Sequence, residues 1–416
     1  MKQTLRDHAY SIINASIEAV QPNDAVCRAL RHFRPGTGRT VLVAAGKAAW
    51  QMAKAAVDSP LKIDEGIVIT KYDHVKAPLP GVLCREAGHP VPDKAGIAAT
   101  EEAIRMVENL GEEDTVLFLL SGGGSALFES PLIPMEELQD ITRQLLANGA
   151  DIVEINTLRK RLSAVKGGRF AQICAPARVF SIVLSDILGD PLDMIASGPA
   201  YPDGSTCHQA LAIAEKYSLQ LSDAARQLLT RETPKMLSNV ETHITGSVRE
   251  LCNAAAAACE SLGYKPVILT DTLCCQAKEA GSFLASIARS HANTGEPLAF
   301  LAGGETVVQL TGAGKGGRNQ ELALAAAAGI EGFENILIFS LGSDGTDGPT
   351  DAAGGIVDGS TANALHQKGF SVHQVLQNND AYTALAAVNG LIFTGPTGTN
   401  VNDVSVVLIL PQETAR

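Results

Sequence analysis

Residues 115–126 read TVLFLLSGGGSA, a continuous apolar run that ends in three glycines between two serines. An unbroken apolar run predicts a strand buried on both faces, because a half-exposed strand would alternate apolar and polar residues. Similar runs lie at 41–45, 66–70, 82–87 and 177–186, separated by stretches with helical spacing. This alternation predicts an α/β fold with a parallel sheet covered on both faces.

The second half of the chain repeats the alternation, with two short helices expected between the apolar runs 336–342 and 391–395. The polar stretch 231–241 marks the expected boundary, which gives domains at 1–238 and 239–416. The strands expected in this half, besides a run ending at Gly304, are 266–270, 306–310, 336–342, 391–395 and 404–410.

Charge and hydropathy exclude two classes of partner. The 416 residues hold 33 Lys and Arg against 45 Asp and Glu, a net charge of −12, which argues against a nucleic-acid-binding surface. The N-terminal segment is amphipathic and contains Asp7 and Glu18, unlike the apolar core of a signal peptide. No apolar run approaches the roughly 20 residues of a membrane span. We therefore expect a cytoplasmic protein that binds no membrane.

The loop after the 41–45 strand contains Gly46 and Lys47 at the start of a helical stretch. A cation is disfavoured at a helix N-terminus unless an anion binds between the two. A bound anion and a solvated lysine after a turn glycine are equally good explanations of this loop.

The glycine-rich loop after residue 120 can point several backbone N–H groups at a carboxylate or a phosphate. A tight strand-to-helix turn is the alternative. The candidate binding residues of these two loops are Gly46, Ser121, Gly122, Gly123, Gly124 and Ser125.

The segment 156–169 concentrates basic residues in an acidic protein. Such a run is usually a solvated helix face, but the pair Gly167-Gly168 before an arginine favours contact with an anion. The candidate binding residues here are Asn156, Lys160, Lys166 and Arg169.

Asp186 and Asp190 follow the fifth apolar run and suit Mg²⁺, which takes one or two carboxylates together with phosphate oxygens. Asp186 could equally cap a helix. His89 lies in a rigid loop after a strand, just before Pro90 and Pro92, where a structural role is more usual and a place in the ligand site is the alternative.

Glycines 312, 314 and 317 match G-x-G-x-x-G, the dinucleotide-binding fingerprint, and indicate a rival class of enzyme. Lys315 and Arg318 crowd this loop with charge, which is unusual for that fingerprint. Acidic residues after the next strand, Asp344 among them, either form a charged site or only Asx turns. Further binding candidates around these loops are Glu305, Lys315 and Asn319.

Eight stretches, taken in this order, resemble the glycerate 2-kinase family, whose glycerate kinase region precedes a MOFRL domain. The resemblance covers about residues 5–410, and members often carry the name hydroxypyruvate reductase. The stretches are VAAGKAAWQMAKAA, AGHPVPD, LLSGGGSALF, NTLRKRLSAVKGGR, VLSDILGDPLDMIASGP, GGETVVQLTGAGKGGRNQEL, SLGSDGTDGPTDAAGG and PTGTNVNDV.

This resemblance implies ATP- and Mg²⁺-dependent phosphorylation of D-glycerate at its 2-hydroxyl. It implies two α/β domains, the first Rossmann-like with a parallel sheet and the second a smaller MOFRL domain, with the active site in the cleft between them. A homodimer stays open. The residues matching the family's catalytic positions are Lys47, Arg318 and Asp344, with Asp186 and Asp190 also at the site.

The residues alone support the same chemistry, because phosphoryl transfer needs positioning and charge neutralisation. We expect Lys47 and Arg318 to contact the transferred phosphate, and Asp344 or Asp186 to hold Mg²⁺ or orient the 2-hydroxyl. The glycine-rich loop would hold the glycerate carboxylate or nucleotide phosphates. The competing hypotheses are an NAD(P)H-dependent hydroxypyruvate reductase and a metabolite sensor without catalysis.

Overall fold

The computed structural model describes residues 2–185, 187, 189 and 191–412. The chain divides into two compact units. Pro22–Thr245 forms the N-terminal unit, and the chain up to Gln21 joins Gly246 and the residues after it to form the C-terminal unit. The sequence-based domains, 1–238 and 239–416, differ from this division at both ends of the N-terminal unit. The first helix packs with the later residues, and the strand that begins at Val240 joins the first sheet.

The first sheet has the strand order β3-β2-β1-β4-β5-β6, which is the order of Rossmann-type doubly wound sheets. Strands β1 to β5 pair in parallel, as the continuous apolar runs predicted. The strands are β1 (Thr40–Ala45), β2 (Glu65–Lys71), β3 (Val82–Ala87), β4 (Thr115–Leu120), β5 (Arg178–Leu184) and β6 (Val240–Gly246).

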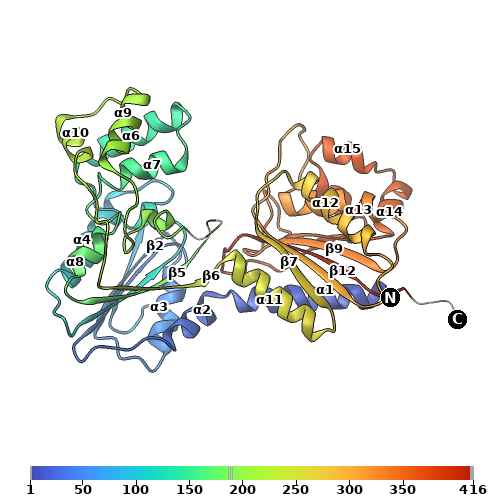
Figure 1. The fold of residues 1–416 in the computed structure, drawn as a ribbon, viewed down its shortest axis with the longest axis horizontal. Coiled ribbons are helices and arrows are strands. Elements are labelled where there is room, and N and C mark those ends of the chain that lie inside the picture. Colours follow the sequence, from blue (N-terminus) through green and yellow to red (C-terminus); the bar gives the residue numbers. More distant parts are fainter. Residues whose placement is uncertain (1, 186, 188, 190, 413–416) are drawn as a thin grey trace. The chain divides into compact units, whose positions relative to one another are not determined.

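Helices cover both faces of this sheet, which explains why its central strands are mostly apolar (Figure 1). In β1, Val41 and Val43 pack toward α4 and α8, whereas Leu42 and Ala44 pack toward α2 and α3. The helices around the sheet are α2 (Pro22–Leu30), α3 (Ala49–Asp58), α4 (Lys94–Val107), α5 (Gly124–Leu127), the 3-10 helix η1 (Ile195–Ser197) and α8 (Arg169–Cys174).

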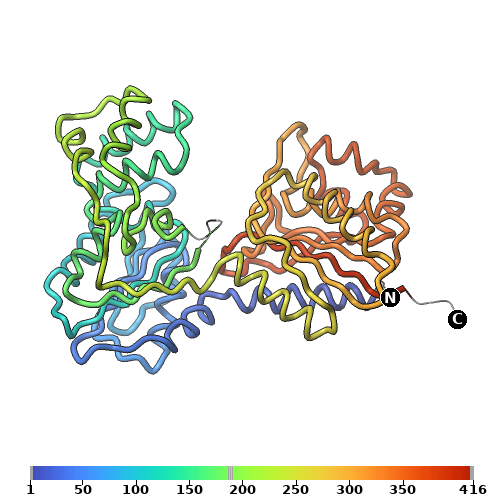
Figure 2. Tube along the Cα trace, in the orientation of Figure 1, coloured from blue at the N-terminus to red at the C-terminus, as the bar shows by residue number. Residues whose placement is uncertain are grey.

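Four more helices of the N-terminal unit form a separate layer with its own apolar core, the green and yellow-green part of the tube in Figure 2. Two of them start with capping boxes, in which Asp151 pairs with Glu154 and Thr206 with Gln209. The helices are α6 (Met135–Ala147), α7 (Ile152–Arg159), α9 (Cys207–Lys216) and α10 (Asp223–Leu229).

The second sheet is mixed, with the order β11-β10-β9-β12-β8-β7. β12 lies between β8 and β9 and runs antiparallel to both, while β7 and β8 are parallel. The strands are β7 (Lys265–Leu273), β8 (Leu298–Gly304), β9 (Ile336–Gly342), β10 (Gly354–Asp358), β11 (Leu391–Ile392) and β12 (Asp403–Ile409).

Helices also lie on both faces of the second sheet, with α1 and α11 on one and α12 and α13 on the other (Figure 1). Within the described residues, no helix is long and apolar enough to cross a bilayer. The helices of this unit are α1 (Lys2–Ala19), α11 (Val248–Ser261), α12 (Ala277–Ser290), α13 (Arg318–Gly329), α14 (Thr361–Gln367), α15 (Val372–Gln377) and α16 (Ala381–Ala387).

Two sequence-based expectations for this sheet are wrong. Residues 306–310 form no strand, because β7 and β12 already occupy both edges of β8. β10 was missed, because it begins with Gly354 and Gly355, which have low strand propensity. A Cβ at Gly354 would lie 1.9 Å from the Ser340 carbonyl oxygen of β9, so close strand packing requires glycine there.

Candidate functional site

The first sheet changes winding direction between β1 and β4, and this is where doubly wound folds bind ligands. The loops that follow these two strands contain Lys47 and the glycine-rich run that starts at Ser121. Strand order therefore brings together two loops that are distant in sequence. This confirms that both lie at a carboxyl edge of the sheet.

Hydrogen bonds join the two loops directly. The Lys47 N–H donates to the Gly122 carbonyl at 2.9 Å, and the Ala48 N–H donates to Ser121 Oγ at 3.1 Å. Gly46 has φ +124°, and a Cβ there would lie 2.2 Å from Ser121 Oγ. Glycine is thus needed at residue 46 for the loops to approach this closely.

The Lys47 side chain is exposed, and its ammonium has no acidic partner among the described residues. A Cβ at Gly123 would lie 3.1 Å from Lys47 Cγ and 3.1 Å from the His89 ring, so both side chains lie beside Gly123. The sequence therefore placed Lys47 correctly at a strand-end loop, and His89 lies beside it.

Ser125 connects this loop to a buried polar network. Ser125 Oγ lies 3.2 Å from Ser197 Oγ, which donates to Asn156 Oδ1 at 2.9 Å. Ser197 and Asn156 are almost fully buried. The predicted binding residue Asn156 is therefore linked to the glycine-rich loop through hydrogen bonds of Ser197.

Lys166 is fully buried below the same loop. Its ammonium donates to the Ser125 carbonyl at 2.9 Å and the Phe128 carbonyl at 3.0 Å, and lies 3.4 Å from Glu129 Oε2. Burial lowers the pKa of Lys166 to about 8, while the Glu129 charge acts in the opposite direction. The structure thus places this predicted anion-binding lysine inside the protein, where it supports the loop.

The Arg169 side chain also makes its hydrogen bonds within the N-terminal unit. Its Nη1 donates to the Ser163 carbonyl at 2.7 Å and to the Arg161 carbonyl at 3.3 Å. Burial lowers the pKa of Arg169, and the charge of Arg161 adds to this. The basic segment is therefore largely interior, contrary to the solvated helix face that is usual for such runs.

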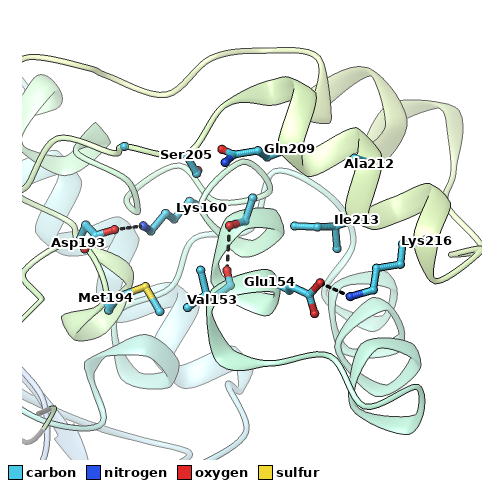
Figure 3. A pocket seen from close by; sticks show the side chains of 12 residues that line it. Val153, Glu154, Lys160, Asp193, Met194, Ser205, Gln209, Ala212, Ile213 and Lys216 are labelled. Atoms are coloured by element: carbon cyan, nitrogen blue, oxygen red, sulfur yellow. Dashed lines mark hydrogen bonds and ion pairs between the residues drawn. The ribbon is translucent and has the colours of Figure 1, made fainter.

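Lys160 lies in the wall of a pocket of about 530 Å³ between α7 and α9 (Figure 3). Its ammonium bonds Asp193 Oδ2 at 3.0 Å and the buried Asp203 Oδ1 at 3.2 Å. On the opposite side, Lys216 pairs with Glu154 at 2.6 Å. The charges of this pocket are thus neutralised by one another, and Lys160 does not face it as a free cation.

The predicted metal ligands Asp186 and Asp190 lie outside the described residues.

A second group of predicted residues lies at one edge of the second sheet. Arg318 begins α13, and its guanidinium makes a bidentate pair with Asp403, from Nε to Oδ2 at 2.5 Å and from Nη2 to Oδ1 at 3.0 Å. Nη1 lies 3.4 Å from Glu305 Oε1. Asp403 starts β12 opposite the last residues of β8 and β9, so sheet register fixes this geometry.

Burial disfavours the charged form of Arg318, but the hydrogen bonds and charge of Asp403 outweigh it and raise the Arg318 pKa. Burial also disfavours the charged form of Asp403 and so raises its pKa, whereas the hydrogen bonds and the charge of Arg318 act to lower it. Beside the pair, Thr306 Oγ1 and Asn402 Nδ2 are buried without a partner in the described part of the chain. They are polar groups that a bound ligand can satisfy.

Asn319 and Asp347 form a buried cap at the start of α13. Gly317, at the N-cap position, has no side chain, and Asp347 accepts instead from the Asn319 N–H at 3.2 Å and the Gln320 N–H at 2.8 Å. Asn319 Oδ1 in turn accepts from Ser340 of β9. Asn319 therefore lies next to Arg318, in a structural network.

Asp344 follows β9 and is half-buried. Its Oδ1 accepts the Thr346 N–H at 2.9 Å, which is the Asx turn considered for this segment. No ion pair of its carboxylate occurs within the described residues, so Oδ2 stays available to a cation. Groups of three or more metal-ligating side chains are absent from the described ranges.

The glycine loop that matches the dinucleotide fingerprint is packed against residues 378–381. Its backbone N–H groups donate to Asn378, Asn379 and Asp380. A Cβ at Gly314 would lie 2.4 Å from the Asp380 Cβ, so these glycines serve close packing. Thirteen residues separate β8 from α13, whereas the fingerprint requires a strand, the loop and a helix in succession. The geometry therefore speaks against a bound pyrophosphate here.

Lys315 of this loop packs its ammonium over the Tyr382 ring, 4.1 Å from the centroid. Sequence reasoning missed Asp403, which pairs with Arg318, and considered Asp347, which caps α13, only as one of the acidic residues after β9. Asp403 lies in the PTGTNVNDV stretch, where a buried strand begins with an acidic residue. That feature could have identified it.

Comparisons with known proteins agree with this organisation. Residues 8–230 match a domain of unknown function, DUF4147, and residues 298–403 match the MOFRL family. The chain is 51% identical over 415 residues to a protein of Thermotoga maritima named D-glycerate 2-kinase, covering 98% of this chain and 99% of that protein.

Two further relatives bear on the reaction class. A crystal structure of glycerate kinase from Thermotoga maritima superposes with a TM-score of 0.94 at 51% identity, covering 98% of this chain and all of that one. An Agrobacterium vitis protein provisionally named hydroxypyruvate reductase is 39% identical, covering 96% and 93% of the two chains. With these matches along nearly its whole length, the chain belongs to the glycerate 2-kinase family.

Proposed function

We propose that this protein transfers the γ-phosphoryl group of ATP to the 2-hydroxyl of D-glycerate, giving 2-phosphoglycerate and ADP. Relatives named for this activity match the chain over nearly its full length. The observation in the structure that carries the proposal is the Lys47 ammonium, which has no acidic partner among the described residues and lies at the switch point of the first sheet.

Phosphoryl transfer proceeds through a transition state with charge spread over the phosphoryl oxygens, so the enzyme acts by positioning and charge neutralisation. In the proposal, Lys47 neutralises part of this charge. The glycine-rich loop beside it offers backbone N–H groups to either the glycerate carboxylate or the nucleotide phosphates. Lys166, buried below, supports the loop through the Ser125 carbonyl.

Arg318 has a related role in the C-terminal unit. The guanidinium carries five N–H donors, more than its contacts with Asp403 and Glu305 use. Asp403 fixes the plane of the guanidinium, and we propose that the remaining N–H groups donate to phosphoryl oxygens. Glu305 and Lys315 would also contact substrate or nucleotide.

Magnesium is part of the proposal, with Asp344, Asp186 and Asp190 as its candidate ligands. Of these, Asp344 fits by its chemistry, because one carboxylate oxygen has no partner in the described part of the chain. Bound Mg²⁺ would neutralise phosphate charge. Asp344 alternatively accepts a hydrogen bond from the 2-hydroxyl of glycerate and orients it.

The proposal places the reaction in the cytoplasm, which fits eight cysteines that are all unpaired.

A coupled assay that detects ADP in the presence of D-glycerate, ATP and Mg²⁺ tests the activity. We expect ADP release that requires D-glycerate, and no oxidation of NADH or NADPH with hydroxypyruvate. Oxidation of either nicotinamide without ADP release would overturn the proposal.

A further inference from the structure

His89 is a polar group at the first sheet's ligand edge that the proposed chemistry leaves unassigned. It follows β3, and its ring lies against the glycine-rich loop that follows β4. A Cβ at Gly123 would be 3.1 Å from His89 Cδ2, 3.1 Å from His89 Nε2 and 3.1 Å from Lys47 Cγ. Gly123 therefore leaves the space in which the imidazole and the lysine stem converge.

Cations surround this imidazole. His89 is half-buried, and neither ring nitrogen has a hydrogen-bond partner among the described residues. Burial lowers the pKa of His89, and the positive charges of Lys47, Lys71 and His74 lower it further. Its ring is thus neutral near pH 7, with one N–H to donate.

Two carboxylates of the neighbouring loops and strands, Asp93 and Glu86, accept hydrogen bonds from groups other than His89. Asp93, close to Gly88, caps α4 by accepting the Gly96 N–H and also accepts the Tyr72 hydroxyl. Glu86 Oε1 accepts the N–H groups of His74 and Val75. The charges that act on the His89 ring are those of Lys47, Lys71 and His74.

We propose that His89 and Lys47 together bind an anionic oxygen group of a substrate, either the glycerate carboxylate or a nucleotide phosphate. The identity of these two anions rests on the proposed function. An anion at this place accepts the imidazole N–H and offsets the repulsion from Lys47, Lys71 and His74. Binding and protonation are then linked, so the anion raises the pKa of His89 and protonation strengthens anion binding by the same factor.

NMR of the protein with ¹³Cε1-labelled histidine tests this without turnover. The His89 resonance, identified by its loss in His89→Gln, is followed from pH 5 to 8 alone and with D-glycerate, ADP or inorganic phosphate. We expect a free-protein pKa below the ordinary value of about 6.5 and an upward shift with at least one probe. A shift with D-glycerate alone identifies the carboxylate, and a shift with ADP or phosphate identifies the phosphate. An unmoved pKa with all three probes would overturn the proposal.

Kinetics give a second test. His89→Ala, which removes the N–H donor, should raise the KM of the substrate that moves the resonance by about tenfold to a hundredfold, the range for hydrogen bonds to charged groups, and its Tm reports whether the fold is kept. His208→Ala, at an exposed residue of α9, is the matched control and should leave KM unchanged. Equal KM values for His89→Ala and wild type would contradict the proposal.

Substitution of the glycine tests the geometry. Gly123→Ala puts a methyl group against both side chains and should raise the same KM. Gly149 also has a positive φ, +74°, but a Cβ there would have no other atom within 4 Å, so Gly149→Ala controls for backbone strain. If D-glycerate is not phosphorylated but the His89 resonance still moves with phosphate, the proposed function fails while the anion site stands.

Discussion

At the scale of single residues, the two proposed phosphate-binding cations differ in how the protein holds them. The Lys47 ammonium has no acidic partner in the described chain, whereas Arg318 is fixed by two carboxylates. An ammonium without a fixed partner can change position as the phosphoryl group moves during transfer. A bidentate guanidinium presents its N–H groups in one orientation.

Replacement of Lys47 by alanine should lower kcat by about a hundredfold to a thousandfold, the loss expected for one donor to the transition state. Steady-state kinetics with D-glycerate and ATP measure this, with Lys368→Ala as an exposed control that keeps full activity. Near-wild-type turnover in Lys47→Ala would remove this lysine from the mechanism.

Asp403→Asn tests whether the carboxylate positions Arg318. The variant keeps the shape of the side chain but loses a charge-assisted pair, which stabilises by about 1.5–3 kcal/mol. We expect a lower free energy of unfolding in urea and a kcat/KM reduced at least tenfold. Kinetics unchanged from wild type, despite the loss of stability, would give Asp403 a purely structural role.

At the scale of elements, the start of α13 depends on a carboxylate from another loop. Burial raises the pKa of Asp347 to about 6, against the opposing effect of the Gln320 and Asn319 N–H groups. In the unfolded chain an aspartate titrates near ~3.9. The folded protein therefore binds this proton more tightly, and its free energy of unfolding falls as pH rises between these values.

Asp347→Asn should remove this pH dependence. From about pH 4 to pH 7, wild type should lose roughly 2–3 kcal/mol relative to the variant, as the pKa difference requires. Urea denaturation at several pH values measures the difference, with exposed Asp223→Asn as control. A constant difference across this range would show that Asp347 titrates normally.

Much of the element order could be predicted from the sequence, because buried strands such as β4 and β8 are almost entirely apolar. β10 could not, since its glycines are required by contacts with Ser340 and Ala323, which are distant in sequence. Residues 306–310 have a strand-like composition, but β8, the strand that precedes them, already pairs with β7 and β12. Pairing between distant strands is the information that local patterns lack.

The candidate site shows the same limit. Lys47 and the glycine-rich loop could be predicted, because parallel strands end at one edge. The burial of Lys166 could not, because a basic segment with interior carbonyl partners has the same composition as a solvated one. Asp403 required the register of β12 against β8 and β9.

At the scale of the whole molecule, the first helix belongs to the unit formed by the end of the chain. Leu5, Ile12 and Ile13 of α1 are fully buried, and α1 packs on α11. Ile12→Ala should therefore destabilise the C-terminal unit by about 2–5 kcal/mol.

Hydrogen exchange should show where this destabilisation acts. We expect faster exchange in α11 and β9 of Ile12→Ala, and faster exchange in the first sheet for the matched variant Ile67→Ala in β2. Loss of protection in β1 to β5 of Ile12→Ala would contradict the assignment of α1 to the C-terminal unit.

The most direct test of the central claim is to identify the product. The purified protein is incubated with ATP, Mg²⁺ and D-glycerate, and the product is assigned by ³¹P and ¹³C NMR. We predict 2-phosphoglycerate and ADP in equal amounts. Formation of 3-phosphoglycerate would contradict the assigned hydroxyl, and the absence of any phosphorylated glycerate would contradict the kinase activity itself.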